Sequence, residues 1–195
     1  MPTVTYPRSA TPAKQRVIDA GIELFGREGF DAGIRAIAAR AGSAVGLVQY
    51  HFGGKEGLRS ACDRQVYAAL DVALPTHFHR AGLVALEPDD LPLLGHILHY
   101  LMRSLGEGGP LAPQVVMRLA AHVQGLTGVS PEGGPQVLQH ARETVRFGLG
   151  ATLLDYAIAR PQSPEEAVAF VRRAWEKEFL PLILGAGVLG RPELR

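Results

Sequence analysis

The side chains with the most readable chemistry in this chain lie between positions 45 and 55. An exposed surface there would hold Val45, Leu47, Gln49, Tyr50, His51 and Lys55. An amide, a phenol, an imidazole and an ammonium group can donate hydrogen bonds to phosphate oxygens and base edges, and small aliphatic groups can contact the thymine methyl. This composition suits a groove of DNA better than bulk water.

Two short helices and a tight turn must position these side chains. Gly42 supplies the positive φ that a sharp turn requires, and Val48 and Phe52, four residues apart, form the inward stripe of the helix that follows it. Arg35 and Arg40 face outward from the helix before the turn, whose inward stripe is Ile34, Ile37, Ala38 and Ala41. The pattern predicts a helix-turn-helix.

Two glycines and a lysine follow the second short helix. Gly53 and Gly54 permit close approach of the backbone, and Lys55 begins the next helix. Free amides at a helix start already suit phosphate, and the lysine adds its charge there.

Residues 11–62 resemble the N-terminal DNA-binding domain of the TetR family of bacterial transcriptional repressors. The resemblance rests on four ordered motifs: ELFGREGF, RAIAARAG, the G-x-x-x-YHF run from Gly46 to Phe52, and GGKEGL. It implies an all-α homodimer of about nine helices. Three helices would bind DNA, and the rest would form an effector pocket and the dimer contacts.

The resemblance also implies roles for individual residues. It places Tyr50, His51 and Lys55 at the operator backbone and Arg35 where the first short helix crosses the strand. The residues that it places at base edges are Val45, Gly46, Leu47 and Gln49. Since Val45 and Leu47 stand where small polar residues often occur, Gln49 carries most of the hydrogen bonding to bases.

One segment departs from the family pattern. The run GFDAGIR, residues 29–35, is one residue shorter than usual and lacks the Ser or Thr that caps the second helix. We expect Gly33 or Asp31 to cap that helix instead.

Composition and charge agree with a globular DNA-binding protein. The 195 residues are 47% hydrophobic, which is enough to fill a substantial core. The net charge is only +1, but residues 1–59 carry a balance of +3 and residues 60–195 a balance of −2. The excess of positive charge therefore lies at the helix-turn-helix end. We expect a DNA-binding domain at residues 1–54 and an effector-binding and dimerisation domain at 55–195.

The single cysteine and the absence of long apolar runs predict a soluble cytoplasmic protein. Cys62 cannot form an intrachain disulfide, and its helical spacing from Leu58, Val66 and Ala69 predicts a buried structural thiol. The N-terminal segment has no apolar run of signal length, and no stretch of about eighteen apolar residues occurs.

The remainder of the chain is predicted to be helical throughout. A first helix begins after Thr11 and stops at Gly29, and a long helix runs from Lys55 until Pro75 ends it near residue 74. Further helices are predicted at 91–105, 112–126, 136–159 and 164–183. Glycine- and proline-rich breakers separate them, notably residues 125–135. No strand alternation stands out.

Two apolar helical stripes near the C-terminus predict a subunit seam. The expected seam residues are Val145, Gly148, Thr152, Tyr156, Val168, Val171, Trp175 and Phe179. We interpret these stripes as halves of a four-helix contact between two subunits. The alternative is that both stripes bury against each other in the core of one subunit.

The middle helices predict a pocket for a small, partly apolar effector. Its expected lining is Tyr67, His96, His99, Tyr100, Met117 and His122. A solvated helix face is the alternative. His77 with His79, and His96 with His99, would also suit a metal, but no cysteine lies near them. We therefore expect no metal and no cofactor.

Ligand-responsive repression by a homodimer is the function that these features predict. A rival of another class is an enzyme that uses His51, His96 or His99 as general base. No Ser, Cys or Asp lies at a spacing from these histidines that is typical of a catalytic nucleophile or its partner, which argues against an enzyme. An activator, or a regulator without a ligand, would carry the same DNA-binding features.

Overall fold

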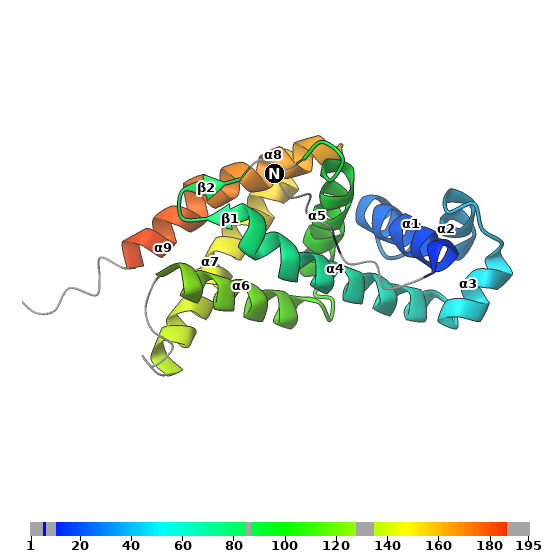
Figure 1. Ribbon diagram of the computed structural model, residues 1–195, viewed down its shortest axis with the longest axis horizontal. Helices are drawn as coiled ribbons and strands as arrows, with labels where there is room; N and C mark the ends of the chain where they lie inside the picture. Colours follow the sequence, from blue (N-terminus) through cyan, green and yellow to red (C-terminus); the bar gives the residue numbers. More distant parts are fainter. Residues whose placement is uncertain (1–5, 7–10, 85–86, 128–134, 187–195) are drawn as a thin grey trace, which may run out of the picture.

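The structure is a computed structural model that describes Tyr6 and residues 11–84, 87–127 and 135–186. It is elongated and almost entirely helical, which confirms the predicted all-α fold (Figure 1). The helices α1, α2 and α3 form one end of the molecule, α9 lies at the other end, and α4 extends between the two parts. The number of helices in the described residues is close to the nine expected.

Three helices pack together at the α3 end. They are α1 (Pro12–Glu28), α2 (Ile34–Arg40) and α3 (Val45–Phe52). Each contributes a fully buried side chain, Phe25, Ile37 and Val48 respectively. The turn between α2 and α3 contains Gly42 at φ 60°, a left-handed conformation that favours glycine. The predicted helix-turn-helix is therefore present, and its buried stripes determine which sides stay exposed.

The long helix α4 (Lys55–His77) connects this bundle to the rest of the protein. The prediction that it ends near residue 74 is wrong, because Pro75 lies inside the helix. Proline cannot donate to the carbonyl four residues earlier and normally disrupts a helix interior. The carbonyl that Pro75 cannot bond is that of Asp71, and the helix nevertheless continues to its end at His77. On the next residue, Thr76 Oγ1 donates a 2.7 Å hydrogen bond to the Val72 carbonyl.

A small hairpin follows α4. Its strands β1 (Phe78–His79) and β2 (Gly82–Leu83) are antiparallel, and two residues per strand are too few to show alternation in the sequence. Trp175 Nε1 donates a 3.1 Å hydrogen bond to the His79 carbonyl, which attaches the hairpin to the C-terminal helices. Nearby, the hydroxyl of Tyr6 lies 2.8 Å from Nε2 of His77.

The larger part of the molecule holds the remaining helices. They are α5 (Leu91–Gly106), α6 (Ala112–Thr127), α7 (Pro135–Ala159), α8 (Pro164–Ala174) and α9 (Leu180–Ala186). The predicted helices at 91–105, 112–126 and 136–159 are confirmed. The breaker expected at 125–135 starts late, because α6 runs through residue 127, and residues 128–134 lie outside the described part of the chain.

The predicted helix at 164–183 is interrupted by a π-helical turn. This turn, Trp175–Phe179, lies between α8 and α9. The start of α8 is capped by Ser163, whose Oγ accepts a 3.2 Å hydrogen bond from the Glu166 amide. Glu166 in turn accepts a 2.7 Å hydrogen bond from the Gln162 amide, so two backbone amides at the start of α8 have side-chain acceptors.

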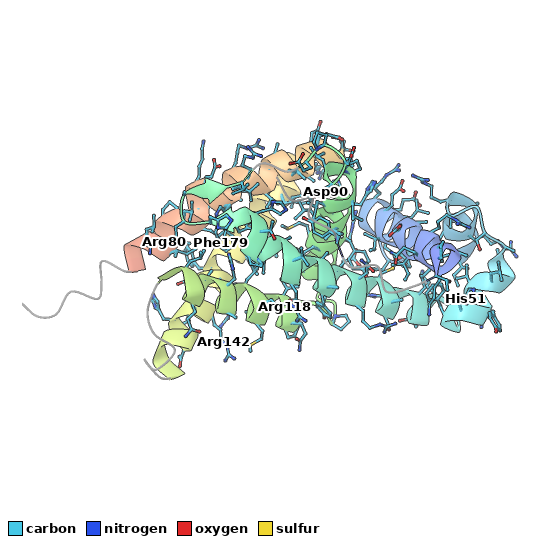
Figure 2. The ribbon with its side chains drawn as sticks, in the orientation of Figure 1. His51, Arg80, Asp90, Arg118, Arg142 and Phe179 are labelled. Carbon is cyan, nitrogen blue, oxygen red and sulfur yellow. The ribbon has the colours of Figure 1, made fainter. Side chains whose placement is uncertain are left out.

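The stripes expected at a subunit seam pack against each other inside one subunit. The ring of Phe179 (labelled in Figure 2) lies so close to Gly148 that an added Cβ would be 2.8 Å from it. Trp175 stacks on Phe179 with 5.7 Å between ring centroids. The expected seam residues that are buried are Val145, Gly148, Thr152, Val168, Trp175 and Phe179, while Tyr156 and Val171 are partly exposed. Close packing at Gly148 explains why the subunit core takes this face of α7.

Candidate nucleic-acid interface

The outer side of α3 is a free surface at one end of the molecule. Tyr50 is 82% exposed, and Val45 and Leu47 are each 44% exposed. Gly46 and Gln49 are also exposed, whereas His51 is partly exposed. Figure 2 shows His51 at this end of the protein. Because Val48 anchors the opposite side, these side chains share one surface that has no partner within the described residues.

Glycines shape the junction between α3 and α4. Gly53 and Gly54 have φ values of 71° and 121°, which favour glycine. Gly57 is required for a different reason, since a Cβ there would lie 1.7 Å from the Phe52 carbonyl oxygen. Sequence reasoning missed Gly57, although the run GGKEG contained the signal. The tight junction places Lys55, the first residue of α4, directly beyond the end of α3.

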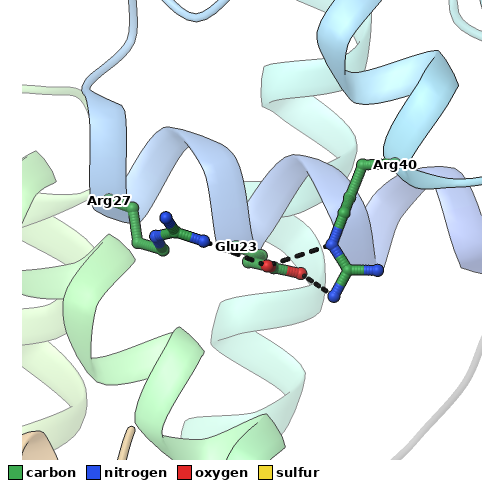
Figure 3. A network of polar contacts seen from close by, with 3 residues as sticks. All are labelled: Glu23, Arg27 and Arg40. Atoms are coloured by element: carbon green, nitrogen blue, oxygen red, sulfur yellow. Dashed lines mark hydrogen bonds and ion pairs between the residues drawn. The ribbon is translucent and has the colours of Figure 1, made fainter. Parts of the chain in front are cut away.

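An ion-pair network holds α2 against α1 (Figure 3). Arg40 binds Glu23 through two contacts, Nη2 to Oε2 at 2.8 Å and Nε to Oε1 at 3.1 Å. Arg27 approaches the same carboxylate at 3.5 Å. Two-point arginine–carboxylate contacts fix orientation as well as distance. Arg40 faces outward as expected, but its guanidinium binds Glu23 and so fixes α2 relative to α1.

The start of α2 carries the remaining predicted DNA contact. Gly33 occupies the N-cap position, and no side chain caps the helix, so Asp31 does not take that role. Arg35 is exposed in the first turn. Another cation that the sequence did not single out lies beside the end of α3, since Lys14 Nζ is 5.4 Å from the centre of the Phe52 ring. Positive charge thus comes from α1, α2 and α4.

The six residues expected to form an effector pocket do not converge on one cavity. Tyr100 is fully buried and donates a 2.6 Å hydrogen bond to Asp63 Oδ1. The His122 ring lies beside Trp175, and its Nε2 is 2.8 Å from the Phe78 carbonyl oxygen. Helical spacing indicated which of these residues share a side of a helix. It did not indicate that each residue contacts a different neighbouring segment.

The outer members of the predicted pocket are held by arginines. The guanidinium of Arg118 lies 4.6 Å from the centre of the Tyr67 ring. Met117 is 42% exposed, and its sulfur is 2.9 Å from Arg142 Nη2. His96 and His99 line one cleft together, beside Tyr156.

Three histidines of the two expected pairs, His77, His79 and His99, make hydrogen bonds. His79 Nε2 lies 2.9 Å from the Thr76 carbonyl oxygen, and His99 Nδ1 lies 2.5 Å from the Tyr156 hydroxyl. Within the described ranges, no group of three or more His, Cys, Asp or Glu side chains is placed to hold a metal ion. Cys62 is buried, as its spacing predicts, and burial raises the pKa of its thiol.

No helix in the described part of the chain is long and apolar enough to cross a membrane.

Comparison with known proteins assigns the helix-turn-helix. Residues 17–62 match the model of bacterial regulatory proteins of the tetR family. The chain is 37% identical over 111 residues to the HTH-type transcriptional regulatory protein RaaS of Mycobacterium tuberculosis, which covers 55% of this chain and 51% of that protein. It is 33% identical over 76 residues to the HTH-type transcriptional dual regulator CecR of Shigella flexneri, which covers 39% of this chain and 34% of that protein.

The whole fold also has a solved counterpart. The crystal structure of a tetR-family transcriptional regulator from Streptomyces coelicolor superposes with a TM-score of 0.57 and 19% sequence identity. The superposition covers 95% of this chain and 92% of that chain. The two sequence relatives, by contrast, are matched over only about half and a third of their lengths.

Proposed function

We propose that this chain, a member of the TetR family of bacterial transcriptional regulators, is a homodimeric, ligand-responsive repressor of a palindromic operator. The observation that carries the proposal is the exposed outer side of α3, held by buried Val48 and followed directly by Lys55. We assign residues 1–54 to DNA binding and residues 55–195 to effector binding and dimerisation.

The DNA contacts divide into two kinds. Gln49 has an amide that can bind adenine at two points, and Val45 and Leu47 can contact thymine methyls. Tyr50, His51 and Lys55 are suited to phosphates, as is Arg35 at the start of α2. The first kind reads sequence, and the second positions the protein on the duplex.

The dimer seam is proposed on the outer face of α7, opposite the buried stripe. Phe147, Leu154 and Ile158 are 72%, 64% and 72% exposed, and they recur at helical spacing. Gly150, also exposed, lies between them and permits close approach of a second helix. Large apolar side chains gathered on one helix face favour burial against a partner. A second copy of the same face would satisfy both subunits through a two-fold axis.

Repression and its relief follow from this arrangement. A two-fold dimer presents two α3 helices to adjacent turns of the major groove. An effector releases DNA only if it binds more tightly to a conformation in which the two α3 helices no longer fit. Since α4 begins at Lys55 and extends into the larger part, a tilt of α4 would move that contact.

Binding to the DNA upstream of its own gene, with the oligomeric state measured in parallel, tests the proposal. We expect the wild-type protein to be a dimer that retards this DNA in a gel. Leu154→Glu should give monomers and weaken binding by more than about tenfold, since one half-site contact is lost. Val84→Glu, a matched change at an exposed apolar residue away from α7, should alter neither property. A monomeric wild type, or retardation equal to that of unrelated DNA, would overturn the proposal.

Repression is tested with a reporter placed behind the same upstream DNA. Removing the gene for this protein should raise transcription of the reporter. A fall in transcription would instead assign an activator.

A further inference from the structure

A cleft of about 920 Å³ lies where the DNA-binding helices meet the larger part of the protein. One wall is the C-terminal end of α1, with Arg27. A second is the side of α5 that carries His99 and Arg103, and a third is the end of α7 with the segment leading to α8. The cleft is therefore shared between the two parts of the molecule.

Three arginines from three elements line this cleft. Arg27 and Arg103 make long ion pairs, to Glu23 at 3.5 Å and to Glu107 at 3.7 Å, and both arginines are substantially exposed. Arg103 Nη2 also donates to the Arg27 carbonyl at 3.3 Å. Arg160 forms no ion pair with a carboxylate of the described residues, and its Nε donates to the Ala157 carbonyl at 3.4 Å. The carboxylates that line the cleft are Glu28 and Glu107. The cleft therefore has more guanidinium groups than carboxylates.

Arg160 is held in an unusual backbone conformation. It is the one non-glycine residue with positive φ in the described part of the chain, at 47°. This position directly follows α7, where glycine is the usual choice. Backbone strain of this kind occurs most often at binding and switch sites. Here the strained residue is also the arginine without a carboxylate partner.

The environment of the two histidines in the cleft favours their neutral form. The Ser163 carbonyl oxygen, 3.3 Å from Nε2 of His99, can only accept, so Nε2 carries the proton and the Tyr156 hydroxyl donates to Nδ1 of the neutral ring. Burial lowers the pKa of His99 and of His96. His96 also lines the cleft, and its buried Nδ1 has no hydrogen-bond partner in the described structure. A bound polar group would satisfy such an atom.

The rest of the lining has apolar side chains beside the polar residues Gln162 and Ser163. Met102 comes from α5, Leu153 and Ala157 come from α7, Pro161 comes from the connection to α8, and Pro164 is the first residue of α8. Carbon surfaces of this kind bury the body of a small molecule, while a few polar groups fix its orientation.

We propose that this cleft binds a small amphipathic anion, with an apolar ring-sized body and a single carboxylate or sulfonate-like group held by Arg103 and Arg160. Arg27 belongs to α1, whereas the other two arginines belong to the larger part. An occupant therefore contacts both parts at once. That this contact regulates DNA binding rests on the proposed function above.

Anilinonaphthalene sulfonate is a suitable probe, because its fluorescence rises in an apolar site and it carries one negative charge. Phenylnaphthylamine has the same rings without the sulfonate. We expect the sulfonate to bind the full-length protein with one site per subunit. The double variant Arg103→Gln/Arg160→Gln should weaken its binding by at least about tenfold, because charge-assisted contacts are lost. Binding of the neutral amine should change less than twofold.

A matched variant separates this cleft from general charge effects. Arg64→Gln/Arg80→Gln removes two arginines that do not line the cleft and should leave the binding of both probes unchanged. If the sulfonate does not bind, or binds the cleft variant as well as the wild type, the proposal is overturned. DNA binding without any probe is measured separately. If the wild-type protein does not bind DNA, the proposed function is overturned. Binding of the sulfonate that depends on Arg103 and Arg160 would still support the proposed anion site.

Discussion

The hydroxyl of Tyr100 donates a 2.6 Å hydrogen bond to Oδ1 of Asp63, which joins the middle of α5 to α4. The ring of Tyr100 also packs edge-on against Phe30, with centroids 5.3 Å apart, and contacts Phe25. The guanidinium carbon of Arg59, in α4, lies 3.7 Å from the centre of the same Phe30 ring. A single tyrosine of α5 thus contacts α4 through Asp63 and α1 through Phe25.

Tyr100→Phe should destabilise the protein while preserving these ring contacts. It removes the hydroxyl donor from the carboxylate of Asp63, a residue that is 9% exposed. Loss of one partner of a buried polar pair costs about 1–3 kcal/mol. Urea denaturation at pH 7 measures the free energy of unfolding. Tyr50→Phe, at an exposed hydroxyl, is the control and should have no effect. Equal stability of Tyr100→Phe and wild type would show that the bond contributes nothing.

The buried histidines should make the protein less stable in mild acid. Burial lowers the pKa of His77, His96, His99 and His122. Below about pH 6.5 the unfolded chain takes up protons that the folded state rejects, so the free energy of unfolding falls as the pH falls. The slope is at most about 1.4 kcal/mol per pH unit for each histidine.

Denaturation at pH 7.5, 6.5 and 5.5 checks this pH dependence. Asp63 has the opposite effect, because burial raises its pKa and its protonation then favours the folded state as the pH falls. His99→Gln should reduce the slope. A wild-type stability that stays constant or rises over this range would contradict the prediction.

Lys55→Ala should weaken binding to all DNA sequences alike. Loss of one phosphate contact lowers the slope of log affinity against log salt by about one per subunit. Titrations of specific and random duplexes at several salt concentrations measure this slope. Lys177→Ala, in the π-helical turn at the other part of the molecule, should behave as wild type. If Lys55→Ala also leaves the slope unchanged, Lys55 is only a solvated charge.

Gln49→Ala should relax the preference at one base pair of each half-site. A bidentate contact to adenine contributes about 1–3 kcal/mol of discrimination against the wrong base. Affinities for duplexes with single base changes measure the preference profile. His140→Ala, an exposed polar residue of α7, serves as the control. An unaltered profile for Gln49→Ala would assign Gln49 to packing or solvent.

The helix-turn-helix could be predicted closely because its determinants are local. Buried positions such as Phe25 and Ile37 recur at helical spacing, and Gly42 marks a turn that few other residues adopt. The end of α4 was predicted wrongly because the loss of one helical hydrogen bond at Pro75 does not stop the helix, which runs two residues further to His77. The ligand site and the seam depend on contacts between distant segments. The apolar stripe at Gly148 is buried by Phe179 of the same subunit. The sequence pattern would be the same if a partner subunit buried it.

Selection of binding sites from a randomised DNA pool tests the central claim most directly, since it reports both sequence reading by α3 and the symmetry of the bound protein. The account predicts that the full-length protein enriches an inverted repeat whose half-site centres are about 34 Å apart, one DNA turn, or a multiple of that distance. The variant Leu154→Glu should fail to enrich the paired repeat. Recovery of sequences without any common element, or of a single unrepeated site by the wild-type protein, would contradict a two-fold dimer that reads DNA through α3.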